Sequence, residues 1–402
     1  MKKTTISVGR PPLLRRTNAL AILKLLREKG TCSRADLVRA SGMSAPTVTN
    51  VVSDLLAAGL VQPLGEGESS GGRPPDLIRF KAERGCLLGV RITASFVSFI
   101  LADLSGNELD TSQVWLAGRK TSPEAICSLI DEETRRLLKA RAMKRKQLMA
   151  LVVGVPAITN VDEGVVLAVS TLDNWRSVPL GAMLRRGVDC MVVVENDTNL
   201  SALGERLRGA ARGAASFVAL DIGTNVSAGI VLDGRLYHGA QWSAGEIGYL
   251  RLPHITRRQP SLHEFGELEA ILSSSGIRKS WHEAAPGPGP TPAPEIRRVD
   301  VAAILDMAQR GEPTARKIVR QRAAIVADVI VNLALILNPG LVLLGGEVGR
   351  HPALLSFVSR ELEQCEFAVP RIDTAMLGEA GVLCGAIAVA LEAIPSILLP
   401  SS

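Results

Sequence analysis

The sequence predicts an α/β protein in which a small helical head with a β-hairpin precedes a larger mixed α/β body of the actin or ribonuclease-H type. Its 402 residues are more than one ordinary domain needs. Hydrophobic residues recur at helical spacing up to about residue 60, whereas from Cys86 onward they alternate or run together as in strands. Residues 1–84 hold 14 Lys and Arg against 7 Asp and Glu, a balance of +7, so the remaining residues sum to −1 within the total of +6.

This charge asymmetry indicates a polyanionic partner for the head only, with a solvated basic face as the alternative. The chain contains no uninterrupted apolar run of about 18 residues, which argues against a membrane span. Lys2 and Lys3 are followed by Ser7, Gly9 and Arg10 rather than by an apolar signal core, so we expect a cytoplasmic protein. The six scattered cysteines predict reduced, partly buried thiols rather than a metal clip.

Helix-start signals precede three helical patterns in the head. The predicted helices span residues 18–29, 34–40 and 45–58, behind the cap residues Thr17, Ser33 and Ser44. Ser33 and Asp36 together form a capping box, which strengthens the second helix start. A short turn at Gly42 separates the second helix from the third, and this arrangement predicts a helix-turn-helix.

In a helix-turn-helix, the third helix enters the major groove of DNA by its N-terminal turns. The side chains there are short and polar or methyl-bearing, which suits phosphate contacts and contacts with thymine methyl groups. The candidate DNA-binding residues of the helices are Arg34, Ser44, Ala45, Pro46, Thr47, Thr49 and Asn50. Asn50 is the best candidate for contacting an adenine edge, and ordinary exposed helix surface is the alternative for Thr47 and Asn50.

Two extended segments, 60–64 and 73–80, flank a stretch rich in Gly and Ser after the third helix. This pattern predicts a β-wing, with Arg73 at its edge where a cation can enter the minor groove or meet phosphate. A flexible linker is the alternative, but the apolar residues Leu77, Ile78 and Phe80 favour a strand.

Strand patterns and one long helix follow in the body. The predicted elements are strands over 87–92, 97–103 and 113–116, a helix over 123–142, and a buried strand over 148–154. Hairpin strands followed by a helix and a further strand are typical of the actin or ribonuclease-H type of body.

Short motifs in both parts resemble a single family. They are Ser33-Arg-Ala-Asp-Leu, Thr47-Val-Thr and Gly71-Gly-Arg-Pro in the head, and Gly154-Val-Pro156, Asn174-Trp175, Glu195-Asn-Asp-Thr-Asn-Leu200, Gly223-Thr224, Gly239-Ala240, Ala244-Gly-Glu-Ile-Gly248, Leu268-Glu-Ala270 and Gly345-Gly346 in the body. By these motifs the chain resembles the ROK family of repressors and sugar kinases, and its head resembles that of the repressor branch. The resemblance implies a winged helix-turn-helix DNA-binding domain at 1–84 and a two-lobed ROK sugar-kinase-like domain at 85–402. Its lobes would span about 85–200 and 201–385, with a C-terminal helix returning to the first lobe.

The phosphate-binding features of the family's kinases are altered. Those kinases begin the body with Gly-x-Asp-x-Gly-Gly-Thr, whereas this chain has Arg91 at the Asp position and Thr93 and Ala94 at the glycines. Side chains there hinder the tight turn, and Arg91 reverses the charge where magnesium would bind. A second glycine-rich loop carries Asn225, Ser227 and Ala228. The resemblance with these departures predicts a protein that is not an enzyme and needs no cofactor.

The zinc site of the family is also altered. Tyr249 stands in place of the family's His, and Pro260, Leu262 and Glu267 stand in place of its three Cys. Because no S/N ligand set remains, we expect no metal.

The sugar-contacting positions of the family are largely kept. By resemblance, the candidate ligand-binding residues are Asn196, Asp197, Glu246, Tyr249 and Glu269. Carboxylates and amides suit sugars because they accept hydrogen bonds from neighbouring hydroxyls. The alternative for Asn196 and Asp197 is that they only cap the helix that starts near Leu200.

These features together predict a transcriptional regulator, a repressor of carbohydrate-use genes relieved by a sugar effector, with double-stranded operator DNA as its partner. The family implies xylose, glucose or N-acetylglucosamine derivatives as effectors and leaves the choice open. A homodimer or higher homo-oligomer is expected from the two-fold symmetry of helix-turn-helix operators. The alternatives are a sugar kinase with residual activity and a ligand-independent DNA-binding scaffold.

Overall fold

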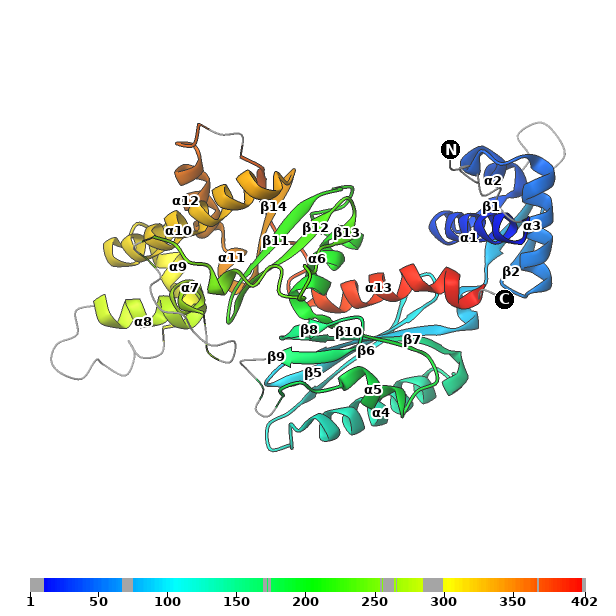
Figure 1. Cartoon of the computed structure of the whole chain (residues 1–402), viewed down its shortest axis with the longest axis horizontal. Helices are drawn as coiled ribbons and strands as arrows, with labels where there is room; N and C mark the ends of the chain where they lie inside the picture. The colour runs from blue at the N-terminus through cyan, green and yellow to red at the C-terminus, as the bar shows by residue number, and fades with distance from the viewer. Residues whose placement is uncertain are drawn as a thin grey trace, which may run out of the picture.

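The computed structural model describes residues 11–66, 75–168, 172, 175–253, 255, 264, 266–284, 299–366 and 369–399. Figure 1 shows a small head at one end of an elongated molecule, attached to a body of two lobes. Predictions on Arg73, Asn174, Pro260 and Leu262 lie outside the described residues and stay predictions.

The head contains three helices and a three-stranded sheet. Its elements are α1 (Pro11–Lys29), β1 (Thr31–Ser33), α2 (Arg34–Ser41), α3 (Ala45–Ala57), β2 (Val61–Glu66) and β3 (Asp76–Phe80). The strands are antiparallel in the order β1-β3-β2, which confirms the hairpin of the predicted wing. Strand β1 was not predicted, because three residues between two helices give no period-2 signal of their own.

Local capping chemistry fixes α2 and α3 as predicted. Asp36 N donates to Ser33 Oγ at 3.2 Å, and Ser33 N donates to Asp36 Oδ2 at 2.8 Å. Ser44 Oγ accepts from Thr47 N at 3.4 Å. The predicted start of the first helix is wrong, because α1 already begins at Pro11, where a proline suits the first turn.

Lobe 1 contains a five-stranded sheet in the order β10-β7-β4-β5-β6. Its strands are β4 (Cys86–Ile92), β5 (Phe96–Asp103), β6 (Glu108–Trp115), β7 (Leu148–Val155) and β10 (Met191–Asn196). Strands β4, β5 and β6 are antiparallel, whereas β4, β7 and β10 are parallel. Helices α4 (Pro123–Ala140) and α5 (Leu180–Arg185) cover one face (Figure 1). A hairpin of β8 (Ile158–Asn160) and β9 (Val165–Ala168) lies at the side that faces lobe 2.

Lobe 2 repeats the same strand order in a second five-stranded sheet, β13-β12-β11-β14-β15. Its strands are β11 (Phe217–Ile222), β12 (Val226–Leu232), β13 (Arg235–Leu236), β14 (Leu341–Gly345) and β15 (Arg371–Thr374). Its helices are α7 (Glu267–Leu272), α8 (Ser274–Ala284), α9 (Val301–Gln309), α10 (Pro313–Leu337), α11 (Gly346–Gly349) and α12 (Pro352–Leu362). Two lobes with one strand order, each an antiparallel hairpin beside parallel strands, confirm the predicted actin or ribonuclease-H type.

Two helices join the lobes, α6 (Asp197–Arg208) and α13 (Ala380–Leu398). They pack closely because glycines face the partner backbone: a Cβ at Gly204 would collide with the Gly381 carbonyl, and one at Gly385 with the Leu200 carbonyl. By length and hydropathy α13 is apolar enough to cross a membrane. It packs on α6, β4 and β7 in the core, which accounts for its composition.

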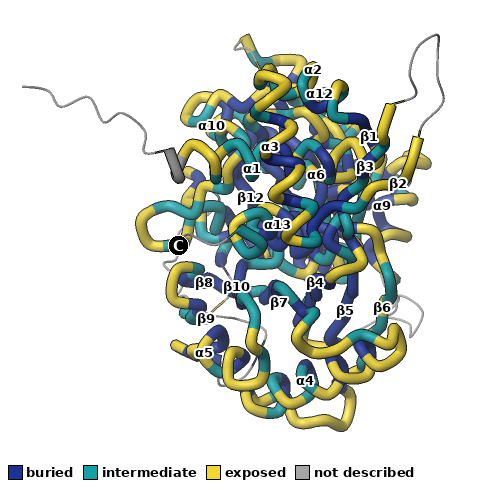
Figure 2. The backbone as a smooth tube through the Cα atoms, turned by 90° about the vertical axis from the view of Figure 1, so that its right-hand side faces the viewer, coloured by how far each residue is buried: buried dark blue, intermediate teal, exposed yellow. Residues whose placement is uncertain are grey.

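Helix α13 also reaches the head. Figure 1 shows it running from the junction of the lobes to α1. Arg27 and Arg16 of α1 donate hydrogen bonds to the carbonyls of Leu391 and Leu399, at 2.7 and 3.0 Å. Buried residues of the head and lobe 1 form one continuous hydrophobic cluster, and Figure 2 shows buried backbone along β4, β5 and β7. The head is therefore fixed to the body by α13 and by this shared core.

Candidate nucleic-acid interface and inter-lobe pocket

The N-terminal turns of α3 form an exposed surface on the head. Val48, Val52 and Leu55 bury the opposite face of the helix. The predicted DNA-binding residues Ser44, Ala45, Pro46, Thr49 and Asn50 are exposed there, and Thr47 is half-buried. The structure thus brings the predicted residues of α3 together on a surface that a major groove can accommodate.

One predicted arginine, Arg34, stands apart from that surface. Arg34 is the first residue of α2, and its Nη1 lies 4.0 Å from Oδ2 of Asp76 on β3. This contact directs Arg34 toward the wing rather than toward the start of α3. Arg73 lies outside the described residues, so its contact with DNA stays a prediction.

All five predicted ligand residues line one cavity between the lobes. Asn196 ends β10 and Asp197 begins α6. Glu246 precedes the short 3-10 helix Ile247–Tyr249, Tyr249 ends it, and Glu269 lies on α7. The cavity encloses about 50 Å³, far less than the roughly 300 Å³ at the lower end of ordinary ligand pockets. A ligand of sugar size therefore needs more room than this arrangement of the pocket offers.

Three of the five side chains, those of Asn196, Glu269 and Tyr249, are already engaged by the backbone. Asn196 Oδ1 accepts from Asn199 N at 3.1 Å, and its Nδ2 donates to the Ala157 carbonyl at 3.0 Å. Asn196 therefore caps α6, as the alternative prediction stated. Glu269 accepts from Val226 N at 3.1 Å and from Gly266 N at 3.3 Å. Asn196 and Glu269 therefore shape the cavity. A ligand must find its hydrogen-bond partners mainly among the other residues that line the pocket.

The other carboxyls of this region are held in a desolvated environment. Burial, reinforced by the charge of Glu269, raises the pKa of Glu246 to about 7. Burial also raises the pKa of Asp197, while the Arg91 guanidinium opposes that rise. Near neutral pH Glu246 can therefore both donate and accept hydrogen bonds, which suits the hydroxyls of a polyol ligand. Tyr249 donates through its hydroxyl to the Glu264 carbonyl at 2.8 Å, and burial raises its pKa to about 12.

The structure adds Asn225 to the pocket. The sequence marked this residue only as a departure from glycine, yet it lines the cavity beside Glu246 and Asp197. Within the described part of the chain, its Oδ1 is buried without a hydrogen-bond partner. A buried acceptor with no partner is costly, so this atom is suited to accept from a ligand hydroxyl.

A second missed feature is an ion pair next to the pocket. His238, in the loop after β13, places Nε2 2.7 Å from Oε2 of Glu195, the residue before Asn196. Glu195 is only 3% exposed, and its hydrogen bond raises the pKa of His238. No sequence signal links these residues, because they approach each other only when the lobes assemble.

A neighbouring cavity of about 290 Å³ lies where the altered phosphate hairpin meets α13. Arg91 forms an ion pair with Glu379, the residue before α13, and lies 5.9 Å from the centre of the Phe96 ring. Burial, reinforced by the charge of Asp197, raises the pKa of Asp221 to about 7 in the same cavity. A guanidinium repels a magnesium ion and cannot coordinate it, so Arg91 does not fit a magnesium–nucleotide complex at the hairpin.

Residues 87–393 match the profile of the ROK family. The chain is a member of the ROK family. Residues 15–62 match a second profile, the winged helix-turn-helix DNA-binding family, so the ROK body carries a DNA-binding head. The match to the body covers more than half of the chain, and the resemblance inferred from short motifs is confirmed.

Proteins similar to this ROK chain include both regulators and kinases. A xylose repressor of Caldicellulosiruptor bescii is 24% identical over 96% of this chain and 98% of its own length. A glucokinase of Halalkalibacterium halodurans is 26% identical over 74% of this chain and 93% of its own. The crystal structure of a ROK family transcriptional regulator, a homologue of the Escherichia coli Mlc protein, superposes with a TM-score of 0.80 at 23% identity, over 96% of this chain and 98% of that one. The regulators therefore match head and body together.

Proposed function

We propose that this ROK protein is a DNA-binding transcriptional repressor of sugar-use genes, relieved by a sugar or sugar derivative in the inter-lobe pocket. The observation that carries the proposal is the coexistence of an exposed α3 on the head with a pocket of buried carboxyls at the other end of α13. The full-length match to a xylose repressor supports the class of genes. We infer that α13 carries the signal, since it contacts the head and, through Val382 and the preceding Glu379, lines the cavity next to the pocket.

The pocket supports a neutral polyol as effector. The groups that a ligand can engage are the carboxyl of Glu246, the unpartnered Oδ1 of Asn225, and the Asp197 carboxyl, which also accepts hydrogen bonds from the backbone. Because the cavity is smaller than a monosaccharide, binding changes the separation of the lobes and with it the position of α13. A ligand shifts this equilibrium only by its difference in affinity for the two lobe arrangements.

A sugar kinase is the second candidate, because a kinase matches the body. The ion pair of Arg91 with Glu379 argues against it, since it occupies the hairpin that would hold magnesium and phosphates. We propose that the protein is not an enzyme. Magnesium-dependent turnover of ATP that requires a hexose and is abolished by Asp197→Asn would revive the kinase function.

The decisive experiment measures binding of the full chain to DNA upstream of its own gene, at fixed salt, with a panel of sugars and sugar phosphates. Tight binding released by one sugar supports the repressor and identifies the effector. Tight binding that no sugar alters supports a ligand-independent scaffold instead. Absence of sequence-specific binding contradicts the proposal.

We also propose that the repressor acts in the cytoplasm as a homodimer, because helix-turn-helix operators are commonly two-fold symmetric. Sedimentation of the full chain with and without operator DNA tests the assembly. A monomer bound to a single half-site would contradict it.

A further inference from the structure

The near-neutral charge of the body conceals a segment as basic as the head. Residues 135–147 contain seven Lys and Arg and no Asp or Glu, so thirteen residues carry +7 while the whole of 85–402 sums to −1. The segment comprises the last part of α4 and the 3-10 helix Arg145–Gln147 in lobe 1. An averaged charge for the body therefore hides a strong local field.

Ion pairs neutralise only part of this segment. Four arginines pair with acidic residues: Arg135 with Asp131, Arg136 with Glu133, Arg141 with Asp110, and Arg145 with Asp131. Three lysines are exposed, Lys139, Lys144 and Lys146. Within the described residues none of the three takes part in an ion pair with a carboxylate. We call these three lysines the basic edge.

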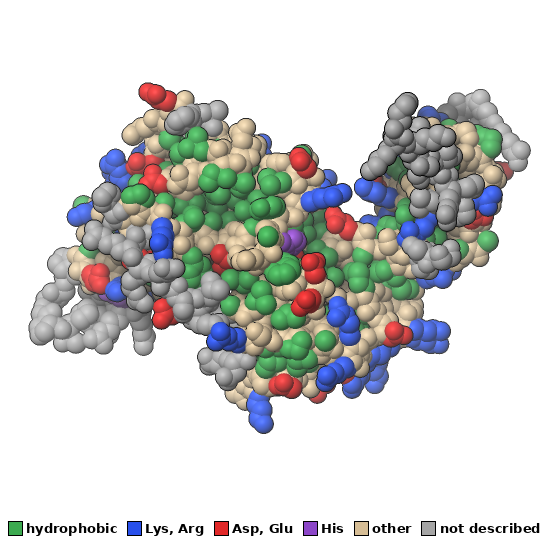
Figure 3. Space-filling view, viewed as in Figure 1, with side chains coloured by type: hydrophobic (Ala, Val, Ile, Leu, Met, Phe, Trp, Pro, Cys, Tyr) green, Lys and Arg blue, Asp and Glu red, His purple; other side chains and the backbone are tan. Residues whose placement is uncertain are grey.

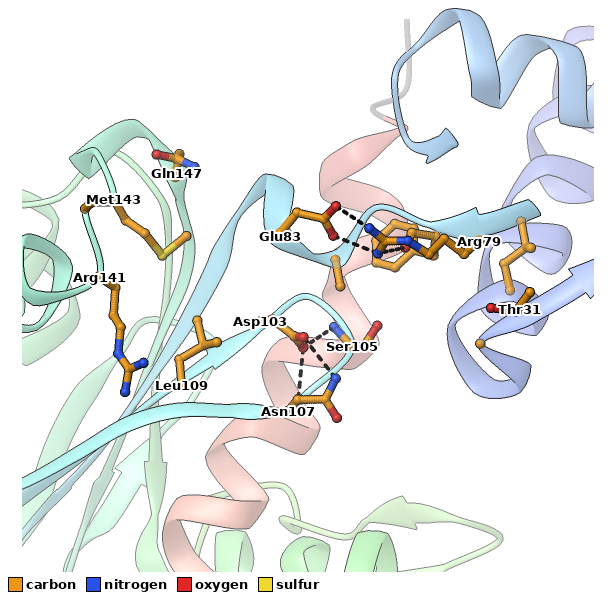
Figure 4. A pocket seen from close by; sticks show the side chains of 15 residues that line it. Thr31, Arg79, Glu83, Asp103, Ser105, Asn107, Leu109, Arg141, Met143 and Gln147 are labelled. Carbon is orange, nitrogen blue, oxygen red and sulfur yellow. Dashed lines mark hydrogen bonds and ion pairs between the residues drawn. The ribbon is translucent and has the colours of Figure 1, made fainter. Parts of the chain in front are cut away.

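The basic edge lies beside the head. A groove of about 560 Å³ lies between the head and the segment that carries these lysines, lined by Gly30, Thr31 and Arg79 on the head and by Arg141, Met143 and Gln147 on the body. Figure 4 shows Arg141 and Gln147 on one side of this groove and Arg79 and Thr31 on the other. Figure 3 shows Lys and Arg side chains gathered on the part of lobe 1 below the head. In Figure 1 the end of α4 and helix α3 lie toward the same end of the molecule.

We propose that the basic edge contacts the phosphates of duplex DNA that flanks the half-site held by α3. This rests on the proposed function, because the head delivers the duplex to this end of the molecule. Unpaired, flexible lysines suit backbone contacts that carry no sequence information. A membrane surface is less suitable, since interfacial segments insert apolar side chains and Leu138 and Leu148 at this end of lobe 1 are buried.

The test compares the full chain on two DNA fragments. The short fragment covers only the operator footprint, and the long one extends it by about one helical turn on each side. The test variant is Lys139→Ala/Lys144→Ala/Lys146→Ala. The matched control is Lys279→Ala/Arg316→Ala/Lys317→Ala, which removes three exposed cations from α8 and α10 at the far end of lobe 2.

Wild-type protein and the control should bind the long fragment more tightly than the short one, with a steeper dependence on salt. The test variant should lose this advantage, and its salt slope on the long fragment should fall by about 2–3, at about 0.9 for each phosphate contact. Its affinity for the short fragment should equal that of the wild type, which also shows that the variant is folded.

Equal affinity of the wild type for both fragments would overturn the proposal. An equal loss on both fragments would also overturn it, because the lysines would then act on the head rather than on flanking DNA. If the test variant binds both fragments as the wild type does but no longer binds vesicles of anionic phospholipid, the edge serves a membrane surface instead. Failure of the wild type to bind even the short fragment would contradict the proposed function itself.

Discussion

Arg27 on the first helix donates a hydrogen bond through Nη1 to the carbonyl of Leu391 on the last helix, at 2.7 Å and across 364 residues of sequence. The other end of the same helix adjoins Glu379, which pairs with Arg91 beside the inter-lobe cavities. One rigid element thus contacts the DNA-binding head at one end and the pocket region at the other. This arrangement gives a physical route for coupling between the two sites.

Arg27→Ala should uncouple DNA release from effector binding. The change removes a partly buried hydrogen bond worth about 1 kcal/mol, so the fold should survive. The effector should still bind, as measured by calorimetry, but its effect on operator affinity should be reduced several-fold. Lys24→Ala, an exposed residue of the same helix, is the control, and a normal effector response in Arg27→Ala would refute the coupling role of α13.

Asn50→Ala should weaken operator binding by about 1–3 kcal/mol, or roughly ten- to a hundred-fold, if its amide contacts an adenine edge. Asn50 is exposed on α3, so stability should not change. Ser53→Ala, on the same helix, is the control. The measurement is fluorescence anisotropy with a labelled operator, and an affinity within two-fold of the wild type would leave Asn50 as ordinary helix surface.

Stability should fall as the pH rises from about 4.5 to about 7, in part because of Glu246. Its pKa in the folded protein, about 7, lies above the ordinary value for a glutamate, so protonation favours the folded state. This contribution is complete below the ordinary pKa and is lost as the pH rises through about 7, by on the order of 1–2 kcal/mol. Glu246→Gln should flatten the pH dependence of thermal unfolding, whereas the exposed Glu163→Gln should not. Part of the pH dependence should remain in Glu246→Gln with the same sign, because the pKa of Asp221 is also raised to about 7.

His238→Ala should destabilise the contact between the lobes, because it removes the hydrogen-bond partner of Oε2 in the buried carboxylate of Glu195. The expected cost is about 1–3 kcal/mol in the free energy of unfolding. A double-mutant cycle with Glu195→Gln isolates the interaction, and we expect a coupling of at least about 1 kcal/mol. Strict additivity of the two changes would show that the pair does not contribute. Since the hydrogen bond to Glu195 raises the pKa of His238, the contribution should decline as the pH rises through that elevated value.

Local chemistry along the chain was enough to predict α2, α3 and the hairpin of the wing. The capping box of Ser33 and Asp36 and the cap at Ser44 act within four residues, so sequence alone located α2 and α3. The strand and helix periods likewise predicted β4, β5, α4 and β7 to within a few residues. Family motifs predicted a common set of pocket residues, and the structure places all five on one cavity.

Tertiary structure decided what each of those side chains can do. Asn196 is committed to capping α6 and Glu269 to two backbone amides, whereas Asn225 presents a buried acceptor that no sequence signal indicated. The pairs of Arg91 with Glu379 and of Arg27 with Leu391 join residues 288 and 364 positions apart. Periodicity and capping report only on neighbours in the chain, and such contacts arise when the lobes and the head pack together. The sequence by itself therefore determined the elements and the family of this protein, and packing decided which groups remain free to bind and how the two sites are connected.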